Sequence, residues 1–173
     1  WTGTIEQYYD LYEITAKHLK SCFPEILIGG ASFAEWSVDE GGIDAFLEQV
    51  KKRNAPLDFL SWHTYSRNLD DFTRRARSVR NSLDARGFYG VESILNEWNY
   101  LINWNEGSNT SRNFDYSKDI FNFFNSINTC MLGGFNAWIH YAAKRYYGML
   151  GDGQCGTSNG SVTKRGYVMA HFA

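Results

Sequence analysis

The chain has 173 residues, enough for one domain around a single hydrophobic core. Its net charge of -2 gives no reason to expect nucleic acid or an anionic membrane as a partner, and no run approaches the ~18 consecutive apolar residues of a spanning helix. Three cysteines without C-x-x-C spacing and four scattered histidines predict neither a disulfide framework nor a metal site, and no motif predicts a cofactor. Because the chain opens on Trp1 and not on Met, we expect a piece of a longer protein.

The first third of the chain alternates helical and extended patterns. Apolar residues from Ile5 to Leu19 recur at spacings of three and four, which predicts a helix. Residues 25–30, "EILIGG", predict a short buried strand ended by glycines. A second helix is expected over 39–50, because Asp39 and Glu40 suit a first helical turn.

The same alternation continues to the end of the chain. Strands are predicted over 57–65 ("LDFLSWHTY"), 90–99 ("GVESILNEWN") and 133–141 ("GGFNAWIHY"), and helices over 69–83, 120–131 and from 166 onward. The helix over 69–83 carries four arginines, which we expect to form a solvated outer face: Arg74, Arg75, Arg77 and Arg80.

Regular alternation of strand and helix predicts an α/β fold built from parallel β/α units. A doubly wound nucleotide-binding sheet is disfavoured, since neither G-x-G-x-x-G nor GxxxxGK[ST] occurs. A (β/α)₈ barrel takes about 250 residues, so four strands would be half of one. If the chain belongs to such a barrel, residues 1–173 would be a single partial domain, half of it.

Polar side chains gather where two neighbouring strands end. Strand alternation puts His63 and Tyr65 on one face of their strand, and Ser93, Leu95 and Glu97 on one face of the next. If both faces line the inside of a barrel, an imidazole, a phenol and a carboxylate meet there. Such neighbours keep a carboxylate ionised and aimed, as a nucleophile requires.

Each of these residues also has a plainer explanation. A glutamate at a strand end is more often solvated than reactive, and a histidine or tyrosine there more often packs than catalyses. Trp98 and Trp138 would more often belong to a core than to a sugar-binding surface. Their joint placement at the ends of consecutive strands is what favours a functional site.

Three ordered motifs carry a resemblance to a known family. "FLSWHTYS", then "SILNEWNY", then "GGFNAWIHYAA" with a trailing "KRGYVMAHFA", resemble the second half of a retaining (β/α)₈ glycoside hydrolase. The most similar family contains β-xylosidases and α-L-iduronidases. The resemblance implies that the predicted strands are the fifth to eighth of the barrel and that the chain belongs to an O-glycosyl hydrolase.

The resemblance also implies roles for individual residues. Glu97 would be the catalytic nucleophile, with His63 and Tyr65 positioning it from the preceding strand. Trp138 would pack against a sugar ring, and Asn96, Trp98 and Trp36 would contact substrate nearby. Asn96-Glu97 also looks like the Asn-Glu pair of the family's acid/base residue. The nucleophile assignment is favoured because the H-x-Y strand precedes Glu97 and because the one later glutamate, Glu106, falls in a loop.

The chain departs from the family by lacking strands one to four and with them the acid/base glutamate. Glu35 is a poor stand-in, so we expect the chain alone to be inactive. The expected partners are a carbohydrate, which favours an extracellular or periplasmic location, and the missing N-terminal half of the barrel. The alternative is a non-catalytic carbohydrate-binding or structural half-barrel whose free strand edges pair in a homodimer.

Overall fold

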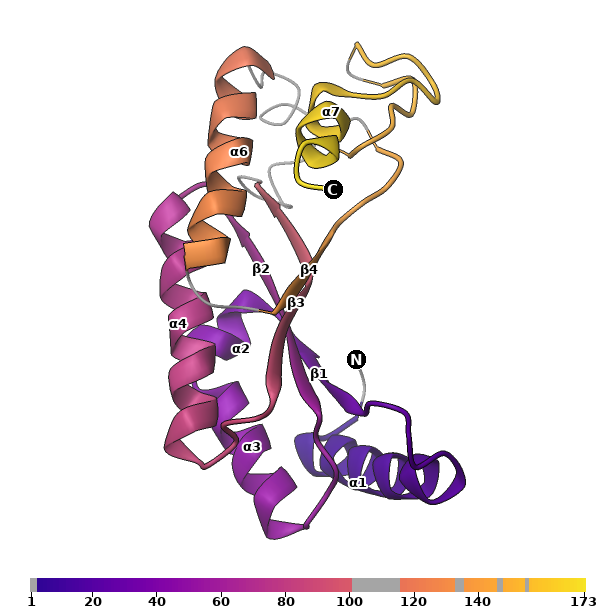
Figure 1. Ribbon diagram of the computed structural model, residues 1–173, viewed down its shortest axis with the longest axis vertical. Coiled ribbons are helices and arrows are strands. Elements are labelled where there is room, and N and C mark those ends of the chain that lie inside the picture. Colours follow the sequence, from indigo (N-terminus) through magenta and orange to yellow (C-terminus); the bar gives the residue numbers. More distant parts are fainter. Residues whose placement is uncertain (1–2, 101–115, 133–135, 146–147, 155) are drawn as a thin grey trace.

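Residues 3–100, 116–132, 136–145, 148–154 and 156–173 are described by the computed structural model (Figure 1). Four parallel strands form one sheet in the order β1-β2-β3-β4, with helices between successive strands. The predicted α/β fold of parallel β/α units is thereby confirmed. The elements are α1 (Ile5–Cys22), β1 (Gly29–Phe33), α2 (Glu35–Asp39), α3 (Gly42–Lys52), β2 (Phe59–Ser66), α4 (Leu69–Ala85), β3 (Glu92–Tyr100), α6 (Tyr116–Leu132), β4 (Ala137–His140) and α7 (Lys164–Ala170).

Local capping interactions explain where two of the helices begin. Thr4 and Gln7 form a capping box at the start of α1, each side chain bonding the other residue's backbone N–H. Asn68 caps α4 by accepting from the backbone N–H of Asp70, and the acidic first turn suits the helix dipole. Among the described residues, no helix is both long and apolar enough to cross a membrane.

The first strand lies further along the chain than its apolar pattern predicts. Residues 25–27 are exposed, with Leu27 at 64% exposure, and Lys20 bonds the carbonyl oxygen of Ile26 at 2.6 Å. Pairing with β2 begins only at Gly29, which lies opposite Phe59. The prediction over 25–30 was therefore wrong in position, because the sheet neighbour and not the apolar run decides where β1 starts.

The helix expected over 39–50 is in fact two helices. Gly41 has φ of 83°, a left-handed conformation that glycine adopts without steric cost, and it separates α2 from α3. Asp39 thus ends α2 and does not begin a helix. The arginines of α4 are not all solvated either, since Arg75 is 7% exposed and Arg80 bonds the carbonyl oxygens of Phe88 and Val91.

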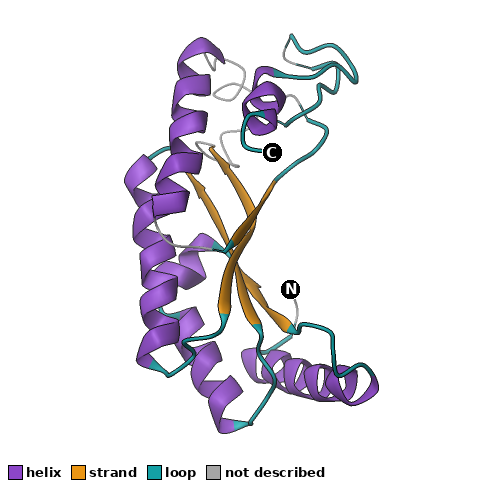
Figure 2. Cartoon of the chain, viewed as in Figure 1, coloured by secondary structure: helices purple, strands orange, loops and turns teal. Residues whose placement is uncertain are grey.

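The hydrophobic core lies between the sheet and the layer of α2, α3, α4 and α6 along one of its faces (Figures 1 and 2). Strand side chains that point into this layer are fully buried, among them Leu60, Trp62 and Leu95. Helix residues meet them from the other side: Phe46, Leu47, Phe72, Val79, Phe123 and Ile127. Burying one such side chain contributes about 1.5–3 kcal/mol, so this layer holds the sheet in place.

The close approach of β1 to β2 at Gly29 makes a testable prediction. A Cβ atom on Gly29 would lie 2.3 Å from the carbonyl oxygen of Phe59, so Gly29→Ala should lower the free energy of unfolding by about 1–3 kcal/mol. Gly90→Ala is the matched control, because a Cβ there meets nothing within 4 Å. Urea unfolding measures both, and equal stability of the two variants would contradict the packing described.

The buried imidazole of His140 predicts a pH dependence of stability. His140 is 7% exposed between Trp98 and Phe123, and neither ring nitrogen has a hydrogen-bond partner among the described residues. Burial lowers the pKa of His140 to about 3, with a further contribution from the charge of Arg165. The unfolded chain binds this proton first, so stability should be lost as pH falls from about 6.5 toward 3, by up to about 1.4 kcal/mol per pH unit.

His140→Phe removes this titration and keeps an aromatic ring in the site. Between pH 7.5 and pH 5 it should lose about 2 kcal/mol less stability than the wild type, because the other titrating groups cancel in the comparison. Urea midpoints at the two pH values give the difference. Parallel losses in the two proteins would show that His140 is not buried in its neutral form.

Candidate functional site

The carboxylate of Glu97 lies where β2 and β3 end, in contact with two residues of β2. The Tyr65 hydroxyl donates to Glu97 Oε1, and His63 Nδ1 lies 3.8 Å from the same oxygen. The Glu97 side chain is 35% exposed. Both contacts involve Oε1, and within the described part of the chain Oε2 has no protein partner. Tyr65 and His63 therefore fix Oε1 of Glu97, whereas Oε2 has no partner among the described residues.

A step in strand register puts Glu97 on this face. Trp62 lies opposite Leu95, but the next residue of β2, His63, lies opposite Glu97, so the pairing skips Asn96. Trp62 and Leu95 are both fully buried against the helices, whereas His63 and Glu97 are partly exposed on the other side. An extra residue in one strand turns the following side chains to the opposite face.

The expected grouping of side chains on β3 was therefore wrong, although the expected meeting of His63, Tyr65 and Glu97 occurs. Ser93 and Leu95 do not share a face with Glu97. Ser93 is fully buried and accepts a hydrogen bond from Trp62 Nε1 at 3.0 Å, on the helix side of the sheet. Strict alternation along the strand could not reveal this, because the bulge at Asn96 breaks it.

The phenol of Tyr65 is held in its protonated, donating form. Burial raises the pKa of Tyr65, and the hydrogen bond to Glu97 and the negative charge of that carboxylate raise it further. The charge of Glu35, at the start of α2, also contributes to the raised pKa. The ring of Tyr141 packs edge-on against Tyr65, with 6.4 Å between centroids. Tyr65 thus serves as a fixed hydrogen-bond donor to Glu97.

Asn96 takes part in a chain of polar contacts across three strands. Its Nδ2 donates to Ser32 Oγ at 2.9 Å, and Ser32 Oγ lies 3.0 Å from Ser61 Oγ. Ser32 has φ of 57°, an uncommon conformation for a residue other than glycine, and its backbone N–H donates to Ser61 Oγ at 3.1 Å. Neither Ser32 nor Ser61 was predicted as a site residue, although Ser61 has the same strand parity as His63 and Tyr65.

The three tryptophans expected at the site have different environments. Trp98 is 1% exposed and stacks on Phe123 at 5.3 Å on the helix side, so its expected contact with substrate was wrong. Trp36, in α2 directly after β1, is 64% exposed. The backbone of Trp138 pairs with Leu95, and its side chain lies outside the part of the structure that is described.

A buried arginine stabilises the end of β3 and, through Asn99, the residue that follows β4. Arg165 of α7 is 2% exposed, donates to Asn99 Oδ1 and to the Tyr100 carbonyl oxygen, and lies over the ring of Phe123. Asn99 in turn donates to the carbonyl oxygen of Tyr141. These contacts link α7 to the residue that packs on Tyr65. No sequence motif indicated them.

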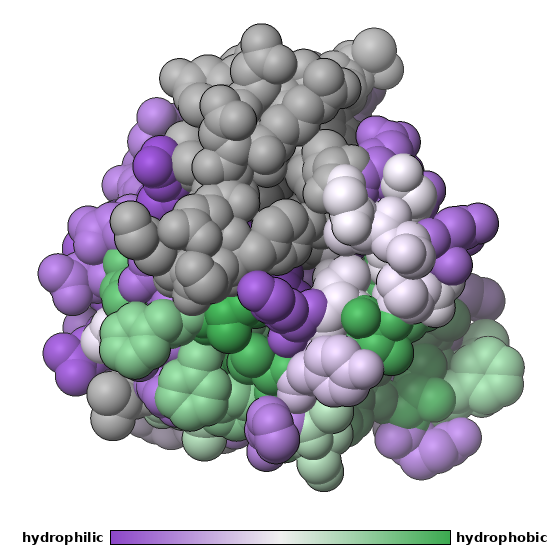
Figure 3. Space-filling view, turned by 90° about the horizontal axis from the view of Figure 1, so that it is seen from above, coloured by the Kyte–Doolittle hydropathy of each residue, from purple (hydrophilic) through white to green (hydrophobic). Residues whose placement is uncertain are grey.

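The surface seen from above, toward which the strands point, mixes hydrophobic and hydrophilic side chains (Figure 3). Among the residues that the structure describes, no group of three or more His, Cys, Asp or Glu side chains could hold a metal ion. The arrangement instead offers a supported carboxylate at the carboxyl ends of parallel strands. In barrels built from β/α units, these ends are where catalytic residues lie.

Sequence comparison relates the chain to glycosidases. Residues 1–84 match the family Glycosyl hydrolases family 39, a range that includes His63 and Tyr65 and ends before Glu97. A β-xylosidase from Caldicellulosiruptor saccharolyticus is 30% identical over 115 residues, which are 61% of this chain and 22% of that protein. A β-xylosidase from Geobacillus stearothermophilus is 35% identical over 65 residues, 35% of this chain and 12% of that protein. The chain thus spans about a fifth or less of these relatives.

Solved structures extend the match along most of the chain. A glucosidase from Croceicoccus marinus superposes with a TM-score of 0.68 at 29% identity, over 81% of this chain and 28% of that one. A monomeric β-xylosidase from Caulobacter crescentus gives a TM-score of 0.76 at 18% identity, over 95% of this chain and 36% of that one, which shows the shared fold. Residues 1–84 therefore resemble a segment of glycosyl hydrolase family 39, and the four parallel β/α units have the fold of part of a (β/α)₈ barrel.

Proposed function

We propose that this segment supplies the nucleophile of a retaining glycoside hydrolase and that Glu97 is that residue. One observation carries the proposal: Tyr65 and His63 both contact Oε1 of Glu97, whose side chain is 35% exposed, and Oε2 has no partner among the described residues. A carboxylate used as a nucleophile needs one oxygen held and the other free to attack. A glutamate that is only solvated does not require hydrogen-bonding neighbours such as Tyr65 and His63.

In the proposed reaction, Glu97 Oε2 attacks the anomeric carbon while the bond to the leaving oxygen breaks. A second carboxyl group gives its proton to that oxygen, and a covalent glycosyl–enzyme ester results. The same second group then takes a proton from water, which attacks the anomeric carbon and releases Glu97. Two inversions give a product with retained configuration.

The neighbouring residues have separate roles in this proposal. Tyr65 donates to Oε1 and holds the carboxylate at a fixed angle, and His63 Nδ1 lies 3.8 Å from the same oxygen. Asn96, fixed by Ser32, and the exposed Trp36 would contact the sugar, with Trp138 on the last strand. An aromatic face suits the apolar side of a sugar ring, since stacking there buries C–H groups.

The second carboxyl group must lie about 5–5.5 Å from Glu97 for retention. We assign it to the rest of the barrel, and we expect the 173-residue chain alone not to turn over a glycoside. In the described sheet, β1 and β4 each have a neighbour on one side only, and the remaining barrel strands would pair there. Without them, the same edges would be open to a second copy of the chain.

The relatives named β-xylosidases suggest the substrate class. We propose a β-linked glycoside with a small neutral sugar, such as a xyloside, as the first substrate to test. The alternative, a carbohydrate-binding or structural half-barrel without catalysis, would need no supported carboxylate and predicts no glycosidase activity that depends on Glu97.

Replacing Glu97 in the whole protein tests the proposed chemistry. Glu97→Ala should lower turnover of 4-nitrophenyl β-D-xyloside by several orders of magnitude, because no covalent intermediate can form. Added azide should restore part of this turnover by attacking the anomeric carbon from the vacated side. Because that is a single inversion, the product should be the α-xylosyl azide, which NMR of the product identifies.

Glu92→Ala is the matched control for this substitution, since Glu92 begins the same strand at its other end and is exposed. It should leave turnover unchanged. A fully active Glu97→Ala would contradict the proposal, and a β-configured azide product would assign Glu97 to the acid/base role.

Tyr65→Phe tests whether the phenol stabilises the ionised carboxylate. A hydrogen bond to a charged group is worth about 1.5–3 kcal/mol, so its loss should lower kcat/KM for 4-nitrophenyl β-D-xyloside by roughly ten- to a hundredfold. Tyr89→Phe is the control, because Tyr89 is 76% exposed and far from the site in the fold. An unchanged kcat/KM in Tyr65→Phe would show that Tyr65 does not act on the nucleophile.

A further inference from the structure

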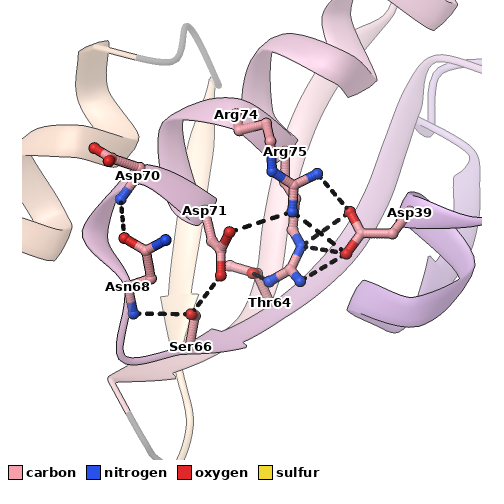
Figure 4. Close-up of polar contacts among 8 residues, drawn as sticks. All are labelled: Asp39, Thr64, Ser66, Asn68, Asp70, Asp71, Arg74 and Arg75. Atoms are coloured by element: carbon pink, nitrogen blue, oxygen red, sulfur yellow. Dashed lines mark hydrogen bonds and ion pairs between the residues drawn. The ribbon is translucent and has the colours of Figure 1, made fainter.

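A network of charged side chains contacts β2 on the helix side of the sheet. Asp39, the last residue of α2, accepts from Arg75 Nη2 at 2.7 Å and from Arg74 Nη1 at 2.8 Å, both arginines belonging to α4 (Figure 4). Arg75 is 7% exposed, and its Nε also bonds both Asp39 oxygens, at 3.3 and 3.2 Å. One carboxylate thus fixes two consecutive guanidinium groups.

The network reaches β2 at two residues. Arg75 Nη1 donates to Thr64 Oγ1 at 2.9 Å, and the Thr64 side chain is fully buried. The second branch runs through Asp71, which accepts from Arg74 Nη2 at 3.3 Å and from Ser66 Oγ at 2.7 Å (Figure 4). Thr64 and Ser66 are the two neighbours of Tyr65 in the strand.

Because Thr64 and Ser66 flank Tyr65 in the strand, these contacts restrict the position of Tyr65. Side chains alternate along a strand, so Tyr65 points away from the network and toward Glu97. Bonds to the residues on either side of Tyr65 fix the backbone from which its ring projects. A phenol on a backbone held at both neighbours has little freedom to leave the carboxylate.

We infer that Asp39 is a positioning residue for the nucleophile: through Arg75–Thr64 and through Arg74–Asp71–Ser66, it holds the end of β2 so that Tyr65 remains bonded to Glu97. This inference rests on the proposed function of Glu97. It assigns a role in the reaction to a carboxylate on the opposite face of the sheet.

The charge of Asp39 suits this role. Burial would raise the pKa of its carboxyl group, but the hydrogen bonds and charges of Arg75 and Arg74 outweigh burial and lower the pKa to about 2. The carboxylate is therefore ionised at every pH at which the enzyme would be assayed. Asp39→Asn keeps the size of the side chain and removes the charge that orders both arginines.

The test is a double-mutant cycle in the whole protein with 4-nitrophenyl β-D-xyloside. Asp39→Asn should lower kcat by roughly ten- to a hundredfold with little change in KM, as expected when a reacting group is misplaced. In a Tyr65→Phe background, Asp39→Asn should cause little further loss, because the residue through which it acts is already gone. Asp44→Asn is the matched control, since it removes a 2.8 Å ion pair between α3 and Arg86 that has no link to β2.

A second readout needs no activity. In protein labelled with ¹³Cζ tyrosine, the Tyr65 signal is the one absent from Tyr65→Phe, and it should shift in Asp39→Asn and not in Asp44→Asn. If Asp39→Asn does not fold, Thr64→Val removes one branch alone and should shift the same signal. A shift without any glycosidase activity would support the positioning and refute the proposed function.

Two results would overturn the inference. The first is an unshifted Tyr65 signal in both Asp39→Asn and Thr64→Val. The second is an equal loss of kcat on adding Asp39→Asn to the wild type and to Tyr65→Phe, which would show that Asp39 does not act through Tyr65.

Discussion

One extra residue in β3 decides which side chains make up the site. Because the pairing of β2 with β3 skips Asn96, Leu95 points into the core and Glu97 points to the open face opposite His63. Without that step, residues of equal parity would share a face, and Glu97 would lie on the side of the buried Leu95. The contact with Tyr65, and everything proposed from it, depends on this local irregularity.

The two faces of β2 and β3 differ in packing and in exposure to solvent. The helix side is close-packed, with Trp62, Leu95 and Trp98 against the helices, and it also carries the ion pairs of Asp39. The open side carries the partly exposed polar groups that could meet a substrate. A rigid backing restricts how far Tyr65 can move, and such restriction keeps a reactive carboxylate at a productive angle.

Periodicity and strand order in the sequence are enough to predict much of this architecture. Alternating β/α units, parallel strands and polar groups at the ends of β2 and β3 all follow from the spacing of apolar and polar residues. The parity of β3 was wrong because a bulge depends on the partner strand. Trp98, which only the resemblance placed at the substrate, is buried in the core. The paired burial of Asp39 with Arg75 was missed because a charged residue on a helix looks solvated until the neighbouring helix is known. The side chain of Trp138 lies outside the described residues.

The central claim is that Glu97 attacks through the oxygen that Tyr65 does not contact. The most direct measurement is a crystal structure of the whole protein after inactivation by a 2-fluoro-xyloside, which traps the covalent intermediate. The account predicts an ester to Glu97 through one oxygen, with the Tyr65 hydroxyl still donating to the other. A sugar attached to any other residue, or an ester through the oxygen that Tyr65 contacts, would contradict it.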